Sequence, residues 1–184
     1  MDYLIRKGNI DDLDLINLFL EKENDYMSLM NLPKIDIPDL EKEIENGNIY
    51  IFKKGKILLG VSCVSLSLKD SYFSFTKSSK KEYDLLYSLN WNGENTVIIK
   101  YFAIEVDYQN KGFGKIFLDS LKSRFKDSFF FTVFNRFNTP YTSFLEKNRF
   151  LGPVETLGFE IPDKCSFLYF LPHKKEGLCS DLAF

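Results

Sequence analysis

The sequence predicts a mixed α and β fold that contains an antiparallel hairpin. Two stretches carry most of that prediction. Residues 48–68 contain the β-rich runs NIYIF and KILLGVSCVSLSL on either side of a polar turn around Gly55, which is typical of a hairpin. Residues 96–124 join the clearest strand of the chain to a glycine-containing turn and an amphipathic helix. The length of 184 residues suits one domain with a sizeable core, so we expect residues 1–184 to form a single domain.

The N-terminal part reads as a strand followed by two helices. Residues 2–7 are short and β-prone. Asn9 can cap the helix that follows, because the apolar residues of 13–19 recur at helical spacing. A second helix is expected over residues 36–46, with a proline in its first turn and Gly47 as its end.

The central part is dominated by one strand and the helix after it. Residues 96–106, TVIIKYFAIEV, predict a strand, and a turn then leads into the helix. The apolar face predicted for that helix consists of Phe113, Ile116, Phe117 and Leu121. The stretch 69–95 is long for a connection inside a compact domain, so we expect it to be functional, partly helical or mobile.

The C-terminal part predicts three strands and one helix. Residues 128–134 form a buried strand, and Pro140 suits the first turn of a helix that reaches Asn148. Two closing strands are expected in residues 154–161 and 165–171.

Composition limits the classes of function. The 24 basic and 26 acidic residues give a net charge of -2, which argues against a general electrostatic hold on nucleic acid. The three cysteines form no CxxC pair, so we expect neither a disulfide framework nor a metal site. No apolar run approaches the roughly 18 to 20 residues of a membrane span. We therefore expect a cytoplasmic protein that does not use the membrane.

The turn QNKGFGK has the chemistry of an anion site. Gly112 and Gly114 let the main chain turn tightly at the start of a helix and present successive N–H groups, while Lys111 and Lys115 add positive charge. Two glycines near a helix start are also common in ordinary turns. The pattern is not a P-loop, because Ile116 follows Lys115, and it lacks the third glycine of a dinucleotide fingerprint.

The wider context of this turn resembles the cofactor motif of the GNAT superfamily of acyl-coenzyme A N-acyltransferases. In YFAIEVDYQNKGFGKIFLDSL, an apolar strand leads to Gln109, Gly112 and Gly114 at the three signature positions. NTPYTSFLEKNRF resembles the second motif of the superfamily, with Asn138 at the capping position. The resemblance implies a central, mostly antiparallel, twisted sheet of about seven strands with a V-shaped splay between the fourth and fifth. About four helices would flank this sheet, and residues 69–95 would be an insertion between the third and fourth strands.

The resemblance also implies how acetyl-coenzyme A, or another acyl-coenzyme A, would bind. Main-chain groups of the strand would pair with the pantetheine arm, amides of the turn would hold the pyrophosphate, and Asn138 would bond the pantetheine or only cap its helix. The cofactor-binding residues expected on this basis are Phe102, Ala103, Ile104, Gln109, Asn110, Lys111, Gly112, Phe113, Gly114, Lys115 and Asn138.

This sequence matches the catalytic positions of the superfamily less well than its cofactor motif. The tyrosine that usually protonates the departing thiolate falls at Leu145, and Arg149 replaces the glycine that follows. Tyr141 lies one turn earlier on the same helix face and could substitute, although it also suits an ordinary core position. Some relatives place a glutamate at the position of Ile98. Glu105 and Asp107 are then the nearest carboxylates that could act as the base, although each could also be a solvated residue before the turn.

Two functions follow as hypotheses. The first is an N-acetyltransferase that moves acetyl from acetyl-coenzyme A to a primary amine of a small molecule or peptide. The second is a non-catalytic acyl-coenzyme A-binding regulatory module of the same fold, which the leucine at position 145 motivates. The expected partners are the acyl-coenzyme A and an amine acceptor, with nucleic acid disfavoured, and either a monomer or a homodimer is compatible with the sequence.

Overall fold

The computed structural model describes residues 3–30, 37, 39–66, 95–135, 139–155 and 166–171. The chain divides into two compact units, of which the first comprises Met1–Ser65 and Ile99–Arg124 and the second comprises Leu66–Ile98 and Phe125–Phe184. A single domain therefore stays a prediction. Apart from Asn95, the expected insertion lies outside the described residues, as does Asn138.

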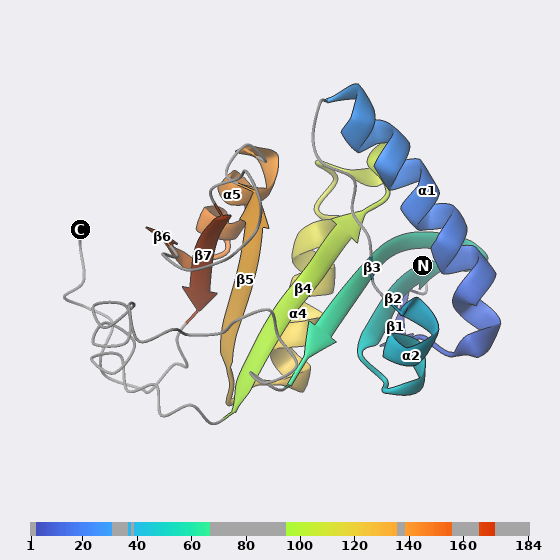
Figure 1. Ribbon diagram of the computed structural model, residues 1–184, viewed down its shortest axis with the longest axis horizontal. Coiled ribbons are helices and arrows are strands. Elements are labelled where there is room, and N and C mark those ends of the chain that lie inside the picture. The colour runs from blue at the N-terminus through green and yellow to red at the C-terminus, as the bar shows by residue number, and fades with distance from the viewer. Residues whose placement is uncertain are drawn as a thin grey trace. The chain divides into compact units, whose positions relative to one another are not determined.

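The first unit contains a set of strands and the helices that cover them (Figure 1). The strand order is β1-β2-β3-β4, with the first three strands paired antiparallel. Its elements are β1 (Tyr3–Lys7), a 3-10 turn (Ile10–Asp12), α1 (Leu13–Leu29), α2 (Leu40–Glu45), β2 (Ile49–Lys54), β3 (Ile57–Ser65), the greater part of β4 (Thr96–Ile104), a second 3-10 turn (Val106–Tyr108) and α4 (Phe113–Arg124).

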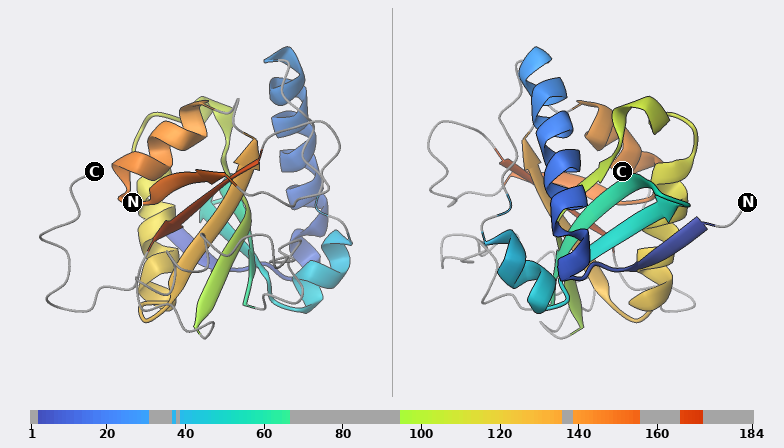
Figure 2. Two further views of the ribbon diagram at one scale, coloured as in Figure 1. Left: turned by 60° about the vertical axis from the view of Figure 1, so that its left-hand side comes forward. Right: turned by 90° about the vertical axis from the view of Figure 1, so that its right-hand side faces the viewer.

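Helices cover both faces of these strands, as the right-hand view of Figure 2 shows for α1 and α4. On one face, Ile16 and Phe19 of α1 belong to the same buried cluster as Ile51, Val61 and Tyr101 of the strands. On the other face, a single residue of α4 contacts two strands: the ring of Phe117 lies 5.6 Å from that of Phe52 and stacks at 5.2 Å on that of Phe102. β4 is therefore packed from both sides in this unit.

The start of α1 is held by charged and polar groups. Asn9 precedes the 3-10 turn, and its backbone N–H donates to the Asp12 carboxylate at 3.0 Å. Arg6 donates two hydrogen bonds to the same carboxylate, at 2.7 and 2.9 Å. Asn9 therefore caps the 3-10 turn, whereas the residue that precedes α1 is Asp12 and not Asn9.

The second unit contains β5 (Phe129–Asn135), α5 (Thr139–Lys147), β6 (Leu151–Glu155) and β7 (Ser166–Leu171). The strand order is β5-β7-β6, with both pairs antiparallel. β5 lies beside the first residues of β4 in the parallel orientation (Figure 1). The predicted mixture of helices with a mostly antiparallel sheet is confirmed, and the splay between the fourth and fifth strands stays a prediction.

Three details differ from the sequence-based expectation. In α4 the buried residues are Phe117, Leu118 and Leu121, whereas Ile116 is exposed, because Leu118 and not Ile116 continues the face that packs on the strands. The sixth strand begins at Leu151, before the predicted start, and residues 156–161 lie outside the described part. Among the described residues, no helix is both long and apolar enough to cross a bilayer.

Candidate functional site

The glycine turn joins the end of β4 to the start of α4. Asn110 has φ 58° and Gly112 has φ 85°, so the chain passes twice through the left-handed region before the helix begins. The N–H of Ile116 donates to the Gly112 carbonyl at 3.2 Å, which is the first bond of the helix. The amides of the first helical turn then have no partner inside the helix and carry its positive dipole end. A Cβ added at Gly112 would meet nothing within 4 Å, so the space beside these amides is open.

The turn is anchored by side chains at both of its ends. The Gln109 side-chain amide donates to the Ile104 carbonyl at 2.9 Å and ties the turn to the end of β4. At the helix end, the Phe113 ring packs edge-on against the rings of Tyr3, Phe52 and Tyr108, with centroids 5.7, 6.0 and 5.9 Å apart. The side chain of Gln109 therefore holds the turn in place. The ring of Phe113 is packed against three other rings, so only the main chain of Phe113 could contact a ligand.

The two lysines of the turn are exposed and already have partners. Lys111 donates to the Asp107 carbonyl at 2.7 Å, and its ammonium lies 5.5 Å from the centre of the Tyr108 ring. Lys115 forms an ion pair with Asp119 one helical turn later. Exposed pairs of this kind contribute little to stability, so both ammonium groups can turn toward an anion at small cost.

Glu105 lies directly after β4 and precedes the 3-10 turn Val106–Tyr108. Its side chain is buried, with 8% of the residue exposed, and one carboxylate oxygen accepts from the Asp107 N–H at 2.9 Å. The other oxygen lies 3.8 Å from the Lys22 ammonium of α1. The Asp107 N–H and the Lys22 ammonium therefore orient the carboxylate from two sides. A carboxylate held in this way can interact with a cation.

A second buried carboxylate, which the sequence analysis missed, lies on α1 and interacts electrostatically with Glu105. Glu23 is 6% exposed, and burial together with the neighbouring charge of Glu105 raises the pKa of its carboxyl to about 7. The signal was present in the sequence, because Glu23 interrupts the apolar stripe that Ile16, Phe19 and Met27 form at helical spacing. A carboxyl on the buried face of a helix is unusual enough to mark a candidate site.

Tyr101 of β4 is a third buried polar residue, and it interacts electrostatically with Glu23. Its hydroxyl is buried and has no hydrogen-bond partner among the described residues. Burial, and then the negative charge of Glu23, raise the pKa of Tyr101 well above its ordinary value, so the hydroxyl stays protonated and available as a donor. A buried hydroxyl without a partner costs on the order of 1–3 kcal/mol, which a polar ligand would offset.

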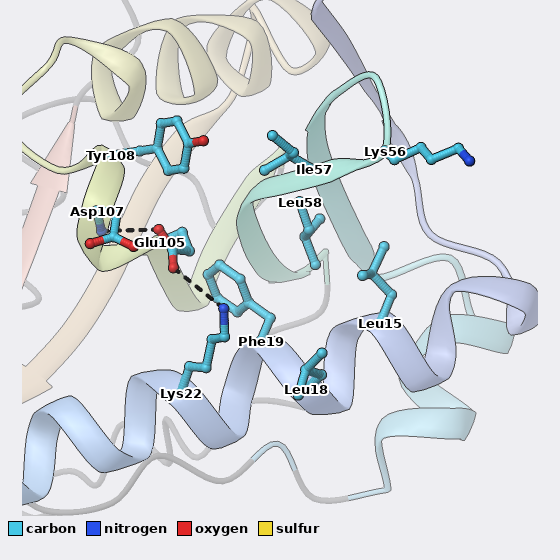
Figure 3. Close-up of a pocket in the computed structure, with 10 residues that line it drawn as sticks. All are labelled: Leu15, Leu18, Phe19, Lys22, Lys56, Ile57, Leu58, Glu105, Asp107 and Tyr108. Carbon is cyan, nitrogen blue, oxygen red and sulfur yellow. Dashed lines mark hydrogen bonds and ion pairs between the residues drawn. The ribbon is translucent and has the colours of Figure 1, made fainter.

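A cavity of about 330 Å³ opens beside Glu105, between α1, β3 and the end of β4 (Figure 3). One end is polar, with Lys22 and Glu105 pointing toward one another and Asp107 close by. The remaining walls are mostly apolar, and they consist of Leu15, Leu18, Phe19, Ile57, Leu58 and the ring of Tyr108, with Lys56 at the far rim.

In the second unit, Tyr141 lies in the first turn of α5. Its hydroxyl lies 3.1 Å from the Thr132 hydroxyl of β5, and its ring stacks on Phe144 with centroids 6.3 Å apart. Burial raises the pKa of Tyr141 to about 12, and the bond to Thr132 only partly opposes this effect. The hydroxyl therefore stays protonated at every working pH and can donate a hydrogen bond.

The two positions that depart from the GNAT motif both lie at the end of α5. Leu145, where a tyrosine was expected, is 1% exposed and belongs to the core. Arg149, where a glycine was expected, has φ 67°. The N–H groups of Arg149 and Phe150 donate to the carbonyls of Glu146 and Leu145, at 2.9 and 3.1 Å, which closes the helix in a Schellman motif. A glycine suits that position because it has no side chain to strain there.

Comparison with known proteins was made by sequence and by structure. No protein-family model matches the chain, and no curated protein matches it by sequence. Solved structures do match. A GNAT-family acetyltransferase from Streptococcus agalactiae superposes with a TM-score of 0.68 at 18% identity, over 94% of this chain and 96% of its own. An acetyltransferase from Thermus thermophilus gives 0.64 at 12% identity, over 94% and 97%.

A third match contains a bound ligand. The PaiA N-acetyltransferase from Thermoplasma acidophilum, solved in complex with coenzyme A, superposes with a TM-score of 0.61 at 18% identity, over 94% of this chain and 99% of its own. At these identities the likeness concerns the fold. The order of the elements, the parallel placement of β5 beside β4 and these superpositions together identify this chain as having the fold of the GNAT-family acetyltransferases.

Proposed function

We propose that this protein is an acyl-coenzyme A-dependent N-acyltransferase that moves acetyl from acetyl-coenzyme A to a primary amine of a small molecule or peptide. The observation that carries the proposal is the open space beside Gly112, at the start of a twelve-residue helix whose first amides have no partner inside the helix. A diphosphate matches these amides in charge and in hydrogen-bonding capacity. The fold that the chain shares with acetyltransferases supports the proposal.

In this proposal the residues of the turn and of β4 bind and orient the thioester. Amides from Asn110 to Lys115 hold the pyrophosphate, and Gln109 keeps the turn against the end of β4 through the Ile104 carbonyl. Main-chain groups of Phe102, Ala103 and Ile104 pair with the pantetheine arm, and Asn138 is proposed to assist. Positioning of two reactants in this way supplies a large part of the rate enhancement in a direct transfer.

Proton transfers are assigned to two side chains. Glu105, whose carboxylate is oriented by the Asp107 N–H and by Lys22, is proposed to take part in removing the proton of the attacking ammonium. Tyr141 is proposed to donate a hydrogen bond to the departing thiolate. Its raised pKa makes it a weaker acid than an ordinary tyrosine, but a thiol with an ordinary pKa near 8.5 needs little assistance to leave.

A binding module without turnover is the second candidate, and the packing of Leu145 favours it. The position at which an acid is expected is filled by a core leucine that is 1% exposed. Such a chain would still bind the coenzyme through the turn. It would release no free thiol from acetyl-coenzyme A, whichever amine was supplied.

The experiment that tests the proposal has two arms. Isothermal calorimetry with acetyl-coenzyme A and with coenzyme A measures binding by the turn, and a screen of primary amines for free-thiol release measures transfer. Binding together with release that requires an amine is expected. Binding without release from any amine would favour the regulatory module, and the absence of binding by folded protein would overturn both functions.

A further inference from the structure

Gly60 is a buried glycine of β3, the strand that lies beside β4 (Figure 1). We propose that Gly60 is a positioning residue for the thioester. Because it has no side chain, it sets how near the end of β4 lies to β3, and it thereby places residues 102–104, on whose main chain the pantetheine arm is proposed to lie. The inference rests on the proposed function, because it adds a residue to the coenzyme site proposed there.

A side chain at Gly60 would collide with three groups at once. A Cβ there would lie 2.8 Å from Ile104 Cδ1, 2.9 Å from the Ala103 carbonyl oxygen and 3.2 Å from Phe117 Cδ1. The Ile104 atom is the tip of a flexible side chain, which can turn away. The Ala103 oxygen belongs to the main chain, so β4 itself would have to move by about 0.5 Å to reach ordinary contact, which begins at 3.4 Å.

The conformation of β3 does not by itself require a glycine at this position. The pairing of β3 with β2 skips Leu59, which is the extra residue of a β-bulge directly before Gly60. Gly60 does not have positive φ, so its backbone could carry a side chain without strain. The close approach of β4 is therefore what excludes a side chain here.

The residues on either side of 102–104 are tied to β3 by hydrogen bonds. The buried Ser62 hydroxyl donates to the Tyr101 carbonyl at 2.9 Å. The Glu105 N–H donates to the Leu59 carbonyl at 3.0 Å. With both ends held, residues 102–104 cannot slide away from a new side chain as a unit, so they would have to bow in the middle.

The bowing would be directed away from β3. Main-chain groups of successive strand residues point to opposite sides, and those of Tyr101, Ala103 and Glu105 face β3. The main-chain groups of Phe102 and Ile104 therefore point away from β3, and these are the groups that would pair with the pantetheine arm in the proposed function. A displacement of about 0.5 Å is as large as the tolerance of a productive binding geometry.

The Phe117 ring of α4 connects Gly60 to Phe102 as well. The ring is fully buried and stacks on that of Phe102, with centroids 5.2 Å apart. A side chain at Gly60 would press on this same ring from β3. Gly60 therefore influences both pairing residues, Ile104 by direct contact and Phe102 through Phe117.

The test compares acetyl-coenzyme A, which has the pantetheine arm, with ADP, which has the diphosphate but no arm. Calorimetry and ligand-observed NMR on the full chain measure the two affinities. In Gly60→Ala we expect acetyl-coenzyme A to bind about tenfold more weakly, because the arm meets a displaced strand. The affinity for ADP should stay within about twofold of the parent value, since ADP uses the glycine turn and not β4 in the proposed function. A protein that had only lost stability would lose both affinities equally.

Gly8→Ala is the matched control. Gly8 is also buried and also lacks positive φ, and the nearest atoms to an added Cβ belong to the side chains of Ile49 and Ile16, at 3.3 and 3.6 Å. This variant crowds the core at side chains outside β4, so both affinities should equal those of the parent. An equal loss of acetyl-coenzyme A affinity in Gly8→Ala and Gly60→Ala would assign the loss to crowding and overturn the positioning role.

Ile104→Val locates the effect and keeps the test decisive if Gly60→Ala does not fold. It removes the Cδ1 atom that lies 2.8 Å from an added Cβ and leaves the Ala103 carbonyl in place. Gly60→Ala added to Ile104→Val should therefore still weaken acetyl-coenzyme A binding relative to Ile104→Val alone. An unchanged affinity in that pair would mean that only the Ile104 side chain mattered, and main-chain positioning by Gly60 would be wrong.

The outcomes separate this inference from the proposed function. If the parent protein binds both ligands and Gly60→Ala keeps its affinity for acetyl-coenzyme A, or loses both affinities equally, the role of Gly60 is overturned and the transferase proposal stands. Failure of the folded parent protein to bind either one of the ligands would count against the proposed function instead, and this inference would fall with it.

Discussion

The glycine turn of the first unit and the end of α5 in the second unit both correspond to motifs of the same superfamily, but they are built differently. At the turn, a Cβ added to Gly112 meets nothing within 4 Å. At the end of α5, Leu145 is 1% exposed and Arg149 occupies a backbone conformation that suits glycine. One region is left open for a ligand, and the other is closed by packing. The comparison indicates that one of the two regions has room for the proposed ligand, whereas the other is filled by its own side chains.

The largest expected effect concerns the open region. Gly112→Trp should weaken acetyl-coenzyme A binding by at least about a hundredfold, because a large side chain would fill the space beside the amides of the helix start. Calorimetry measures the affinity and thermal unfolding measures the stability.

Gly55→Trp is the matched control for that variant. Gly55 also has positive φ, 57°, and also has nothing within 4 Å of an added Cβ, but it lies in the turn between β2 and β3. Both variants therefore share the backbone strain, and only Gly112→Trp should lose the coenzyme. An equal loss of affinity in the two would show that strain, and not the site, is responsible.

The reverse result is expected in the closed region. Leu145→Ala should lower the free energy of unfolding by about 2–5 kcal/mol, because it removes a buried side chain and leaves a cavity. Its affinity for acetyl-coenzyme A, measured below the melting transition, should stay within about threefold of the parent value. A large loss of affinity at full occupancy of the folded state would mean that α5 and the coenzyme site are coupled, and the contrast between the regions would fail.

Tyr141→Phe tests whether α5 still contributes to transfer. The variant removes the hydroxyl that lies 3.1 Å from Thr132, so a loss of about 1 kcal/mol of stability is expected from the lost hydrogen bond. If Tyr141 stabilises the departing thiolate, kcat should fall about tenfold with KM unchanged. Thr132→Val removes the same hydrogen bond but keeps the tyrosine hydroxyl, and an equal fall in kcat there would assign Tyr141 a structural role only.

The smallest effects compare two helix ends with the same geometry. Both α2 and α5 end in a Schellman motif, with Gly47 at φ 70° in the first and Arg149 at φ 67° in the second. Arg149→Gly should raise the free energy of unfolding by about 0.5–1 kcal/mol, and Gly47→Ala should lower it by about 1 kcal/mol. Urea denaturation measures both, and changes of the same sign would contradict this interpretation.

The sequence alone determined most of the helices and strands and the glycine turn. Local patterns were sufficient there, because the hairpin at Gly55, the strand that ends at Ile104 and the helix that begins at Phe113 each depend on neighbouring residues. The expectation that α5 ends near Asn148 is confirmed for the same reason. Turn-forming residues and hydrophobic periodicity act over a few neighbouring residues, so both can be recognised in the sequence alone.

Tertiary structure decided which side chains meet. It coupled Glu23 of α1 electrostatically to Tyr101 of β4 and to Glu105 directly after β4, residues more than seventy positions away in the sequence. Burial and the charge of Glu105 together raise the pKa of the Glu23 carboxyl to about 7. It also decided that Leu118, and not Ile116 as predicted, lies on the packed face of α4. Burial and electrostatic coupling depend on distances through space, and no local pattern specifies those distances. The sequence therefore located the proposed coenzyme turn, and only the packing of α1 on the strands revealed the buried polar residues Glu23 and Tyr101.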